Sequence, residues 1–276
     1  MSVTFKHHKH LYESIDPTDK IIWTSVTKFI SLFKEPFDAV KISEKSSKNK
    51  KSKWYGVSPQ MIQNIWKMES ERADQAGTWY HNQREDDISS LDTLERDGRA
   101  LPIIKPIING DIKFAPVQQL TEGIYPEHFV YLKSAGICGQ ADRVEVVRDV
   151  INITDYKTNK EIKTQGFKNW EGVTKKMLGP ISHLDDCNLN HYTLQVSMYM
   201  HIMIKHNPNL RPGKMELQHV TFKIKELDEF GFPIAVKDAF GKPIVDKITH
   251  YTVPYLRSEV REMIKYFTDK NHEKNL

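Results

Sequence analysis

Residues 139–157, with the sequence GQADRVEVVRDVINITDYK, decide the fold predicted for this chain. Two segments rich in Val, Ile and Thr flank Arg148 and Asp149, a pattern that predicts a β-hairpin with its turn at those two residues. Counting outward from that turn, Asp142 lies directly opposite Asp155. Directly opposed residues of an antiparallel pair share one face, with Cβ atoms about 5 Å apart.

Two carboxylates placed in this way repel each other unless a cation lies between them. Lys157 follows Asp155 by two residues and therefore projects from the same face of the strand. We expect the two acids and the lysine to converge at one end of a sheet, where a divalent metal with oxygen ligands is the natural occupant. The alternative is a salt-bridge cluster on the surface of an edge hairpin.

Upstream of the hairpin, residues 77–85 read GTWYHNQRE. If this segment is helical, His81 and Glu85 are four residues apart and lie on one face. The histidine could serve as a metal ligand beside the hairpin. The alternative is an ordinary histidine that packs against neighbours or faces solvent.

Downstream of the hairpin, residues 190–206 form a strongly apolar helical pattern. Gln195 and Tyr199 are polar exceptions four residues apart on this helix. They could cover the edge of the core, or they could point their polar ends into a cleft.

The remaining segments suggest a single fold around the hairpin. In chain order we expect a helix over 24–33, a helix that begins at Ser58-Pro59, a second helix after Gly77, a strand over 129–132, an irregular segment over 160–188, a strand over 216–224, further β-structure over 230–255 and a closing helix over 255–268. This order predicts an α/β or α+β fold with a mixed central sheet flanked by helices.

The composition excludes several classes of protein. The chain has 276 residues, of which 39% are hydrophobic, so it can bury a full core without covalent staples. Two cysteines, Cys138 and Cys187, cannot form a disulfide framework, a four-cysteine zinc site or a four-cysteine iron–sulfur site. No apolar run approaches the roughly 18 residues of a membrane span. Residues 1–10 are polar and basic and lack the apolar region of a secretory signal, so we expect a cytoplasmic protein without a membrane partner.

The net charge of +4 is mild, but lysines are concentrated between residues 41 and 53. Such a run is typical of a solvated loop, and it could also be an arm that neutralises phosphates. The lysines that we name as candidate DNA contacts are Lys48, Lys50, Lys51 and Lys53. Nearby Trp54, Tyr55 and Trp66 could stack on unpaired bases or pack against the first helices.

We expect one domain over residues 1–276. It comprises an N-terminal helical wrapping over 1–60 that contains the lysine-rich loop 41–53, a catalytic core over 61–225, and a C-terminal hairpin and helix over 226–276.

Taken together, four short motifs in this order resemble the PD-(D/E)XK nuclease superfamily, and most closely its RecB-type exonuclease branch. The motifs are Gly77-Thr78 with His81 and Glu85, Gly139-Gln140-Ala141-Asp142, Asp155-Tyr156-Lys157, and Gln195 with Tyr199. The resemblance implies a restriction-endonuclease-like core with the element order αβββαβ. It also implies metal-dependent hydrolysis of phosphodiester bonds with one or two Mg²⁺ or Mn²⁺ ions.

The resemblance also implies roles for individual residues. His81, Asp142 and Asp155 would be metal ligands, together with the backbone carbonyl of Tyr156. Lys157 would position the attacking water and offset charge on the scissile phosphate. Glu85 would orient His81 or a metal-bound water, and Gln195 and Tyr199 would hold either the DNA strand or Lys157.

The sequence departs from the superfamily's pattern at two points, which restrict the subgroup that it resembles. Ala141 stands where the superfamily's name places proline, a change that the RecB-type branch often shows. With only two cysteines the chain lacks the iron–sulfur cluster of some members of that branch. It is therefore most similar to cluster-free exonucleases, such as the mitochondrial genome maintenance type and phage recombination exonucleases.

The expected function is a metal-dependent DNA exonuclease in replication, repair or recombination. It would act on single strands or DNA ends in a bacterial or phage-infected cell, with replication or recombination proteins as candidate partners. The alternatives are a structure-specific endonuclease of the same fold and a non-catalytic DNA-binding module.

A second metal site is a weaker alternative. His183, Cys187 and His191 recur at intervals of four residues and could bind zinc. The segment could equally begin the helix that carries Gln195.

Overall fold

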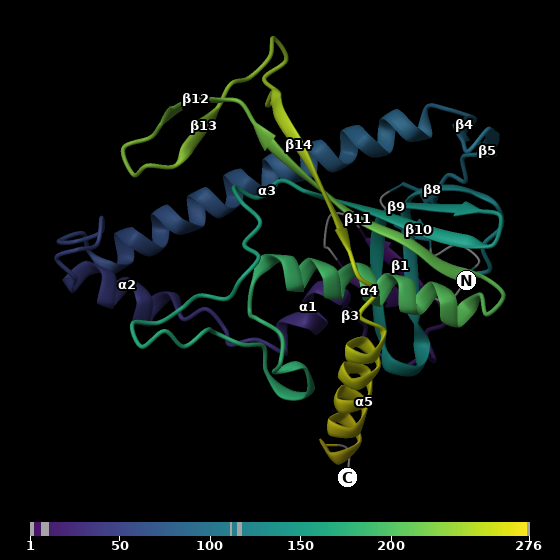
Figure 1. The fold of residues 1–276 in the computed structure, drawn as a ribbon, viewed down its shortest axis with the longest axis horizontal. Helices are drawn as coiled ribbons and strands as arrows, with labels where there is room; N and C mark the ends of the chain where they lie inside the picture. Colours follow the sequence, from purple (N-terminus) through teal and green to yellow (C-terminus); the bar gives the residue numbers. More distant parts are fainter. Residues whose placement is uncertain (1–2, 7–10, 111, 115–117, 275–276) are drawn as a thin grey trace.

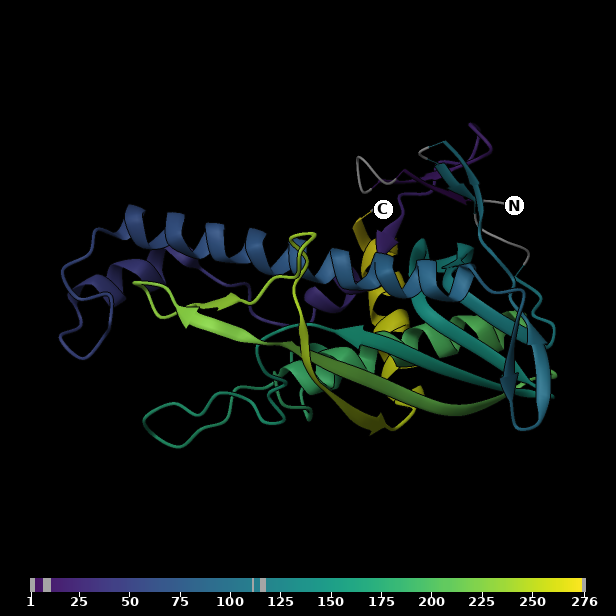
Figure 2. The ribbon, with the colours of Figure 1, turned by 90° about the horizontal axis from the view of Figure 1, so that it is seen from above.

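The computed structural model describes residues 3–6, 11–110, 112–114 and 118–274, and side chains as far as residue 270. Within these residues the chain has a mixed α+β fold with five α-helices and a mixed six-stranded sheet (Figures 1 and 2). The helices are α1 (Val26–Ser31), α2 (Ala39–Lys48), α3 (Pro59–Ser89), α4 (Asn188–His206) and α5 (Arg257–Lys274). No helix in this part of the chain is long and apolar enough to cross a membrane.

The central sheet has the strand order β14-β11-β10-β9-β3, with β8 also pairing with β9. Its strands are β3 (Thr24–Ser25), β8 (Gly123–Leu132), β9 (Ile137–Val147), β10 (Val150–Lys157), β11 (Arg211–Phe222) and β14 (Val245–Val253). Strands β10 and β11 are parallel because the chain returns through α4 between them. Strand β3 is also parallel to β9, and the other pairs are antiparallel.

Three smaller sheets surround this core. One has the order β2-β1-β7-β6, and the other two are the hairpins β4–β5 and β12–β13. Their strands are β1 (Val3–Lys6), β2 (Leu11–Ser14), β4 (Thr93–Arg96), β5 (Arg99–Pro102), β6 (Ile107–Asn109), β7 (Ile112–Phe114), β12 (Ile224–Leu227) and β13 (Pro233–Ala235). The β12–β13 hairpin and the returning strand β14 make up the expected C-terminal β-structure.

The register of the β9–β10 hairpin is the predicted one. The ladder runs from Val147 opposite Val150 to Arg143 opposite Thr154. One more step along the two strands sets Asp142 opposite Asp155.

Helix α3 is continuous, so the prediction of a separate helix after Gly77 is wrong. Ser58 caps the helix as expected, since its hydroxyl accepts a hydrogen bond from the Met61 N–H at 3.3 Å. Gly77 lies inside the helix, where it packs against the loop after β10. A Cβ atom at this position would lie 2.9 Å from the Thr158 Oγ1, so the glycine here serves close packing rather than helix termination.

The lysine-rich segment is not wholly a loop, contrary to the prediction for residues 41–53. Helix α2 extends to Lys48, and the Asp38 side chain caps it by accepting from the Lys41 N–H at 2.9 Å. The turn after α2 carries Trp54, which is buried and contacts Trp66 edge-on. Both tryptophans therefore pack within a hydrophobic cluster at the start of α3, which is the second of the two alternatives considered for them.

The main core lies between the central sheet and helices α1, α4 and α5. Helix α4 supplies a large share of it, including Leu194, Met198 and Ile202, all fully buried. The opposite face of the sheet meets α3, where Tyr80 contacts Tyr156 in a smaller cluster. Helices α3 and α4 thus flank the β9–β10 hairpin from the two faces of the sheet.

Gly139 is expected to be intolerant of any side chain. It lies in β9 against α4, and an added Cβ would be 2.7 Å from Tyr199 Cε1 and 3.3 Å from Val26 Cγ2. Overpacking of this kind costs about 1–3 kcal/mol, so Gly139→Ala should lower the free energy of unfolding in urea by that amount. Gly77→Ala is the matched control, because the Thr158 hydroxyl can rotate away and alanine favours a helix by roughly 0.5–1 kcal/mol. Equal losses in both variants would contradict this packing.

Candidate active site

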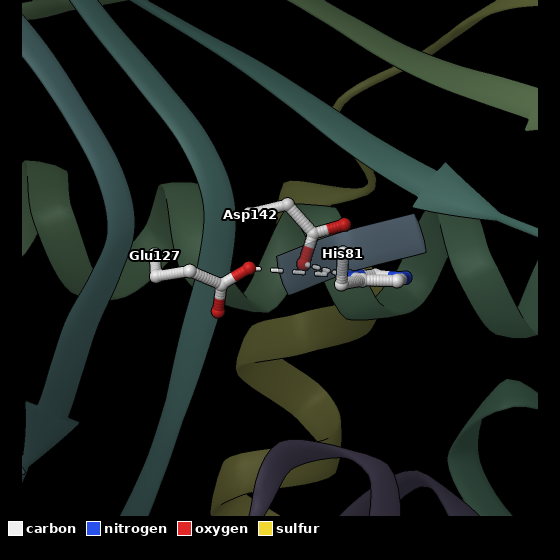
Figure 3. Close-up of side chains that lie close together, drawn as sticks. All are labelled: His81, Glu127 and Asp142. Atoms are coloured by element: carbon white, nitrogen blue, oxygen red, sulfur yellow. Dashed lines mark ion pairs between the residues drawn. The ribbon is translucent and has the colours of Figure 1, made fainter. Parts of the chain in front are cut away.

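Three side chains from separate elements form the centre of the site, shown in Figure 3. They are His81 of α3, Glu127 of β8 and Asp142 of β9, and their ligand atoms all lie within 4.8 Å of one another. His81 Nδ1 lies 3.3 Å from Asp142 Oδ1 and 3.9 Å from Glu127 Oε1. Two carboxylates and one imidazole are a suitable donor set for Mg²⁺ or Mn²⁺.

Glu127 is the residue that sequence reasoning missed. Its φ is 45°, a left-handed conformation that is rare for a residue other than glycine. The ladder between β8 and β9 omits this position: Pro126 pairs with Arg143 and His128 with Ala141, so Glu127 stands opposite Asp142. Backbone strain of this kind concentrates at functional sites. The signal in the sequence is a lone acid within an otherwise buried strand.

A second group of polar residues adjoins the first and connects β10 to α4. Asp155 is fully buried, and its Oδ2 lies 2.5 Å from Lys157 Nζ. Lys157 donates a hydrogen bond to Gln195 Oε1 at 3.2 Å. The Gln195 amide in turn donates to the Tyr199 hydroxyl at 3.0 Å. This chain of contacts fixes the position of the lysine ammonium group.

The structure therefore separates the predicted ligands into two groups. Asp142 lies with His81, as expected, whereas Asp155 contacts Lys157 and Glu127 completes the cluster of three ligand atoms. The two groups remain adjoining, because the Tyr156 N–H donates to Asp142 Oδ2 at 2.5 Å. The Tyr156 ring is buried beside the His81 ring.

The charges of the cluster are strongly coupled. Burial alone would lower the pKa of His81, but the charges and hydrogen bonds of Asp142 and Glu127 outweigh it and raise that pKa to about 11. Burial raises the pKa of Glu127 above its usual value. Burial also raises the pKa of the Asp142 carboxyl, but the charge and hydrogen bond of the His81 imidazolium outweigh burial and lower that pKa. A protonated imidazole thus supplies the positive charge between the two carboxylates, and His81 would have to release this proton in order to ligate a metal ion.

The Asp155–Lys157 pair has its own electrostatic balance. Burial, opposed by the charge of Lys157 and aided by that of Asp142, raises the pKa of Asp155 to about 6. Burial would lower the pKa of Lys157, but the two aspartates keep it above its ordinary value. Lys157 is therefore a cation at neutral pH.

The residues fit a divalent ion beside this pair. Asp155 Oδ1 is buried and has no hydrogen-bond donor among the described residues. An oxygen acceptor that is buried and unsatisfied is costly, and a bound cation would satisfy it. Together with the cluster of His81, Glu127 and Asp142, Asp155 offers a metal ion anionic oxygen ligands and one imidazole.

Glu85, which we expected to orient His81 or a metal-bound water, pairs with a different residue in the structure. The Glu85 carboxylate accepts from Lys113 Nζ at 3.2 Å, and Lys113 is only 1% exposed. Glu85 is four residues from His81 along α3, as predicted, but its charge partner is this buried lysine of β7. The position that faces His81 belongs to Glu127.

The lysine-rich segment lies far from the cluster. Helix α3 rises about 1.5 Å per residue, so its start, next to the lysines, is roughly 33 Å from His81. Figure 1 shows α2 at the distant end of α3. Lys53 is also not part of a free arm, since its Nζ donates to the Phe230 carbonyl at 2.6 Å and lies over the Trp54 ring. Lys48, Lys50 and Lys51 are exposed at the end of α2 and in the turn that follows.

The alternative zinc site does not form. His183 Nε2 lies 3.3 Å from Glu259 of α5, whereas His191 Nε2 lies 2.7 Å from Asp186 Oδ1. Cys187 occupies the N-cap position of α4. The two histidines thus face different partners, and the segment begins the helix that carries Gln195.

Comparisons of the chain with models of protein families, with curated proteins and with solved structures found no match. The functional assignment therefore depends on the residues and geometry described above.

Proposed function

We propose that this protein is a divalent-metal-dependent nuclease that hydrolyses phosphodiester bonds in DNA, as an exonuclease on single strands or ends. The observation that carries this proposal is the adjacency of two groups: the ligand cluster His81–Glu127–Asp142 and the pair Asp155–Lys157. The main strands of the central sheet and the helices on its two faces follow the order α3, β8, β9, β10, α4, β11, with the short strands β4 to β7 between α3 and β8. This order supports the proposal, because the resembled nuclease core has the order αβββαβ.

The chemistry that each group would perform follows from its charge. A bound Mg²⁺ or Mn²⁺ supplies positive charge and an acidified water at neutral pH. His81, Glu127 and Asp142 would hold the ion, and Asp155 would contribute its unsatisfied oxygen. Lys157 would donate hydrogen bonds to the phosphate or the attacking water, because Asp155 and Gln195 fix its ammonium group in advance.

The opposed carboxylates favour an enzyme over a binding module. A surface that only binds DNA gains nothing from two buried acids, Asp142 and Asp155, and a half-buried one, Glu127, because each repels the phosphates. The resemblance to cluster-free exonucleases favours attack at ends over attack within a strand, and this choice is open to a direct assay.

The proposal predicts that linear single-stranded DNA is degraded in Mn²⁺ or Mg²⁺ while the circular form of the same sequence persists. Chelation with EDTA should stop the reaction, since the ion would supply the acidified water that attacks the phosphate. Nucleotide release from labelled substrates measures both effects. Cutting of the circle would favour the endonuclease, and tight DNA binding without any metal-dependent cleavage would refute the proposed hydrolysis.

A further inference from the structure

Helices α4 and α5 enclose a surface groove of about 660 Å³ that the proposed reaction does not use. Its polar lining includes His201 and Lys205 from α4 and Arg257, Arg261 and Lys265 from α5. Figure 1 shows α5 beside α4 and extending away from the central sheet.

The positive charge of the groove has no compensating acid among the described side chains. No carboxylate of those residues lines it. Among the residues whose side chains the structure describes, none forms an ion pair with Lys205, Arg257, Arg261 or Lys265. Burial, followed by the charges of Lys205, Arg261 and Arg257, lowers the pKa of His201 to about 4, which agrees with a positive field in the groove. Like charges held together repel each other, and a bound anion would relieve this repulsion.

The groove is on the other side of α4 from the candidate active site. Each helical residue turns the chain by about 100°, so His201 lies roughly 200° around the helix from Tyr199. The groove cannot hold the phosphate that Lys157 would contact. An anion bound there would make a separate contact.

The spacing of the cations suits a chain of phosphates. Arg257, Arg261 and Lys265 follow one another at intervals of four residues, which is a rise of about 6 Å at each step. Two of the three are arginines, whose planar guanidinium groups match phosphate oxygens bidentately. A row of this length is longer than a single phosphate requires, whereas a nucleic-acid strand presents successive phosphates along its backbone.

We propose that this groove binds the phosphate backbone of a nucleic-acid strand at a second contact, remote from the site of hydrolysis. The inference rests on the proposed function for the identity of the polyanion, but it does not require cleavage. It predicts that the protein holds long strands more tightly and with greater salt dependence than strands too short to reach the groove.

Binding of labelled single-stranded DNA, measured by fluorescence anisotropy in EDTA over a range of salt, tests this inference. Replacing two contacts by Arg257→Gln and Arg261→Gln should reduce the salt slope for a long strand by about 1.4, at roughly 0.7 for each phosphate contact. A short strand should bind this double variant and the wild type equally. Lys20→Gln with Lys105→Gln is the matched control, because it removes two exposed lysine charges elsewhere.

Three results would overturn the inference. The first is an equal salt slope in the groove variant and the control variant. The second is an equal loss of affinity for short and long strands. In the third, the wild type binds inorganic phosphate or a mononucleotide and the groove variant does not, while both bind the long strand with the same affinity. That result would assign the groove to a small anion. This binding assay contains no divalent metal and does not depend on cleavage. A failure to hydrolyse DNA in the separate cleavage assay with Mn²⁺ would therefore refute the proposed function and not this inference.

Discussion

Loss of the Lys157 ammonium group is expected to reduce metal-dependent DNA cleavage by about 10²- to 10³-fold, the cost typical of removing one preorganised donor from an active site. Lys157 is a protonated, buried side chain whose ammonium group is fixed by Asp155 and Gln195. The variant for this test is Lys157→Gln combined with Asp155→Asn, and its rate is compared with that of Asp155→Asn alone, because Asp155 would itself contribute an oxygen to the metal ion. Removing the lysine alone would leave a buried, unpaired carboxylate that costs about 3–5 kcal/mol of stability.

The control for this prediction is Lys163→Gln. Lys163 is a nearby lysine whose side chain is 64% exposed and pairs with Glu161 at 3.5 Å, so its loss should leave the rate unchanged. Single-turnover cleavage of linear DNA measures the rate, and thermal unfolding confirms that both variants fold. A folded double variant that cleaves at the wild-type rate would remove Lys157 from the proposed chemistry.

Glu127→Gln is expected to weaken Mn²⁺ binding by about 100-fold or more. Changing a residue that only hydrogen-bonds to a metal ligand already costs about 10- to 100-fold in metal affinity, and Glu127 would be a ligand itself. Its carboxylate belongs to the cluster of three ligand atoms, and an amide offers the ion one neutral oxygen instead of a charge. Calorimetric titration with Mn²⁺ measures the affinity. Asp246→Asn, which changes an exposed carboxylate of β14, should have no effect.

The same titration separates two ligand sets. The resemblance alone assigns Asp155 to the metal, whereas the geometry adds Glu127 to His81 and Asp142. If Glu127→Gln bound Mn²⁺ like the wild type while Asp155→Asn lost binding, the cluster in the structure would not be the metal centre.

The register of the β9–β10 hairpin could be predicted from the sequence because it depends only on the position of the turn. Once Arg148 and Asp149 form the turn, the pairing of Asp142 with Asp155 follows by counting, and the structure has that register. The Gln195–Tyr199 pair was accessible for the same reason, since helical periodicity alone sets it on one face.

Glu127 was not accessible because its position depends on a strand pairing and a left-handed backbone that no local pattern specifies. Strand β8 begins at Gly123, six residues before the strand that we predicted, and Glu127 interrupts its ladder with β9. The prediction that a separate helix begins after Gly77 was wrong for a related reason. The role of Gly77 is a close contact with Thr158, which is distant in sequence, so a rule for helix ends could not anticipate it.

Long-range pairing also explains the small sheet that the sequence did not predict. Strand β1 pairs with β7, more than a hundred residues later, so that Phe5 lies opposite Lys113. This pairing encloses the lysine that holds Glu85. Neither segment alternates over enough residues to indicate a strand by itself.

His81, Glu127 and Asp142 are proposed to hold a divalent metal ion together. Anomalous diffraction from crystals of the protein grown with Mn²⁺ tests this proposal most directly. We expect a manganese peak within coordination distance of all three side chains. No peak at saturating Mn²⁺, or a peak bound by other residues, would contradict it.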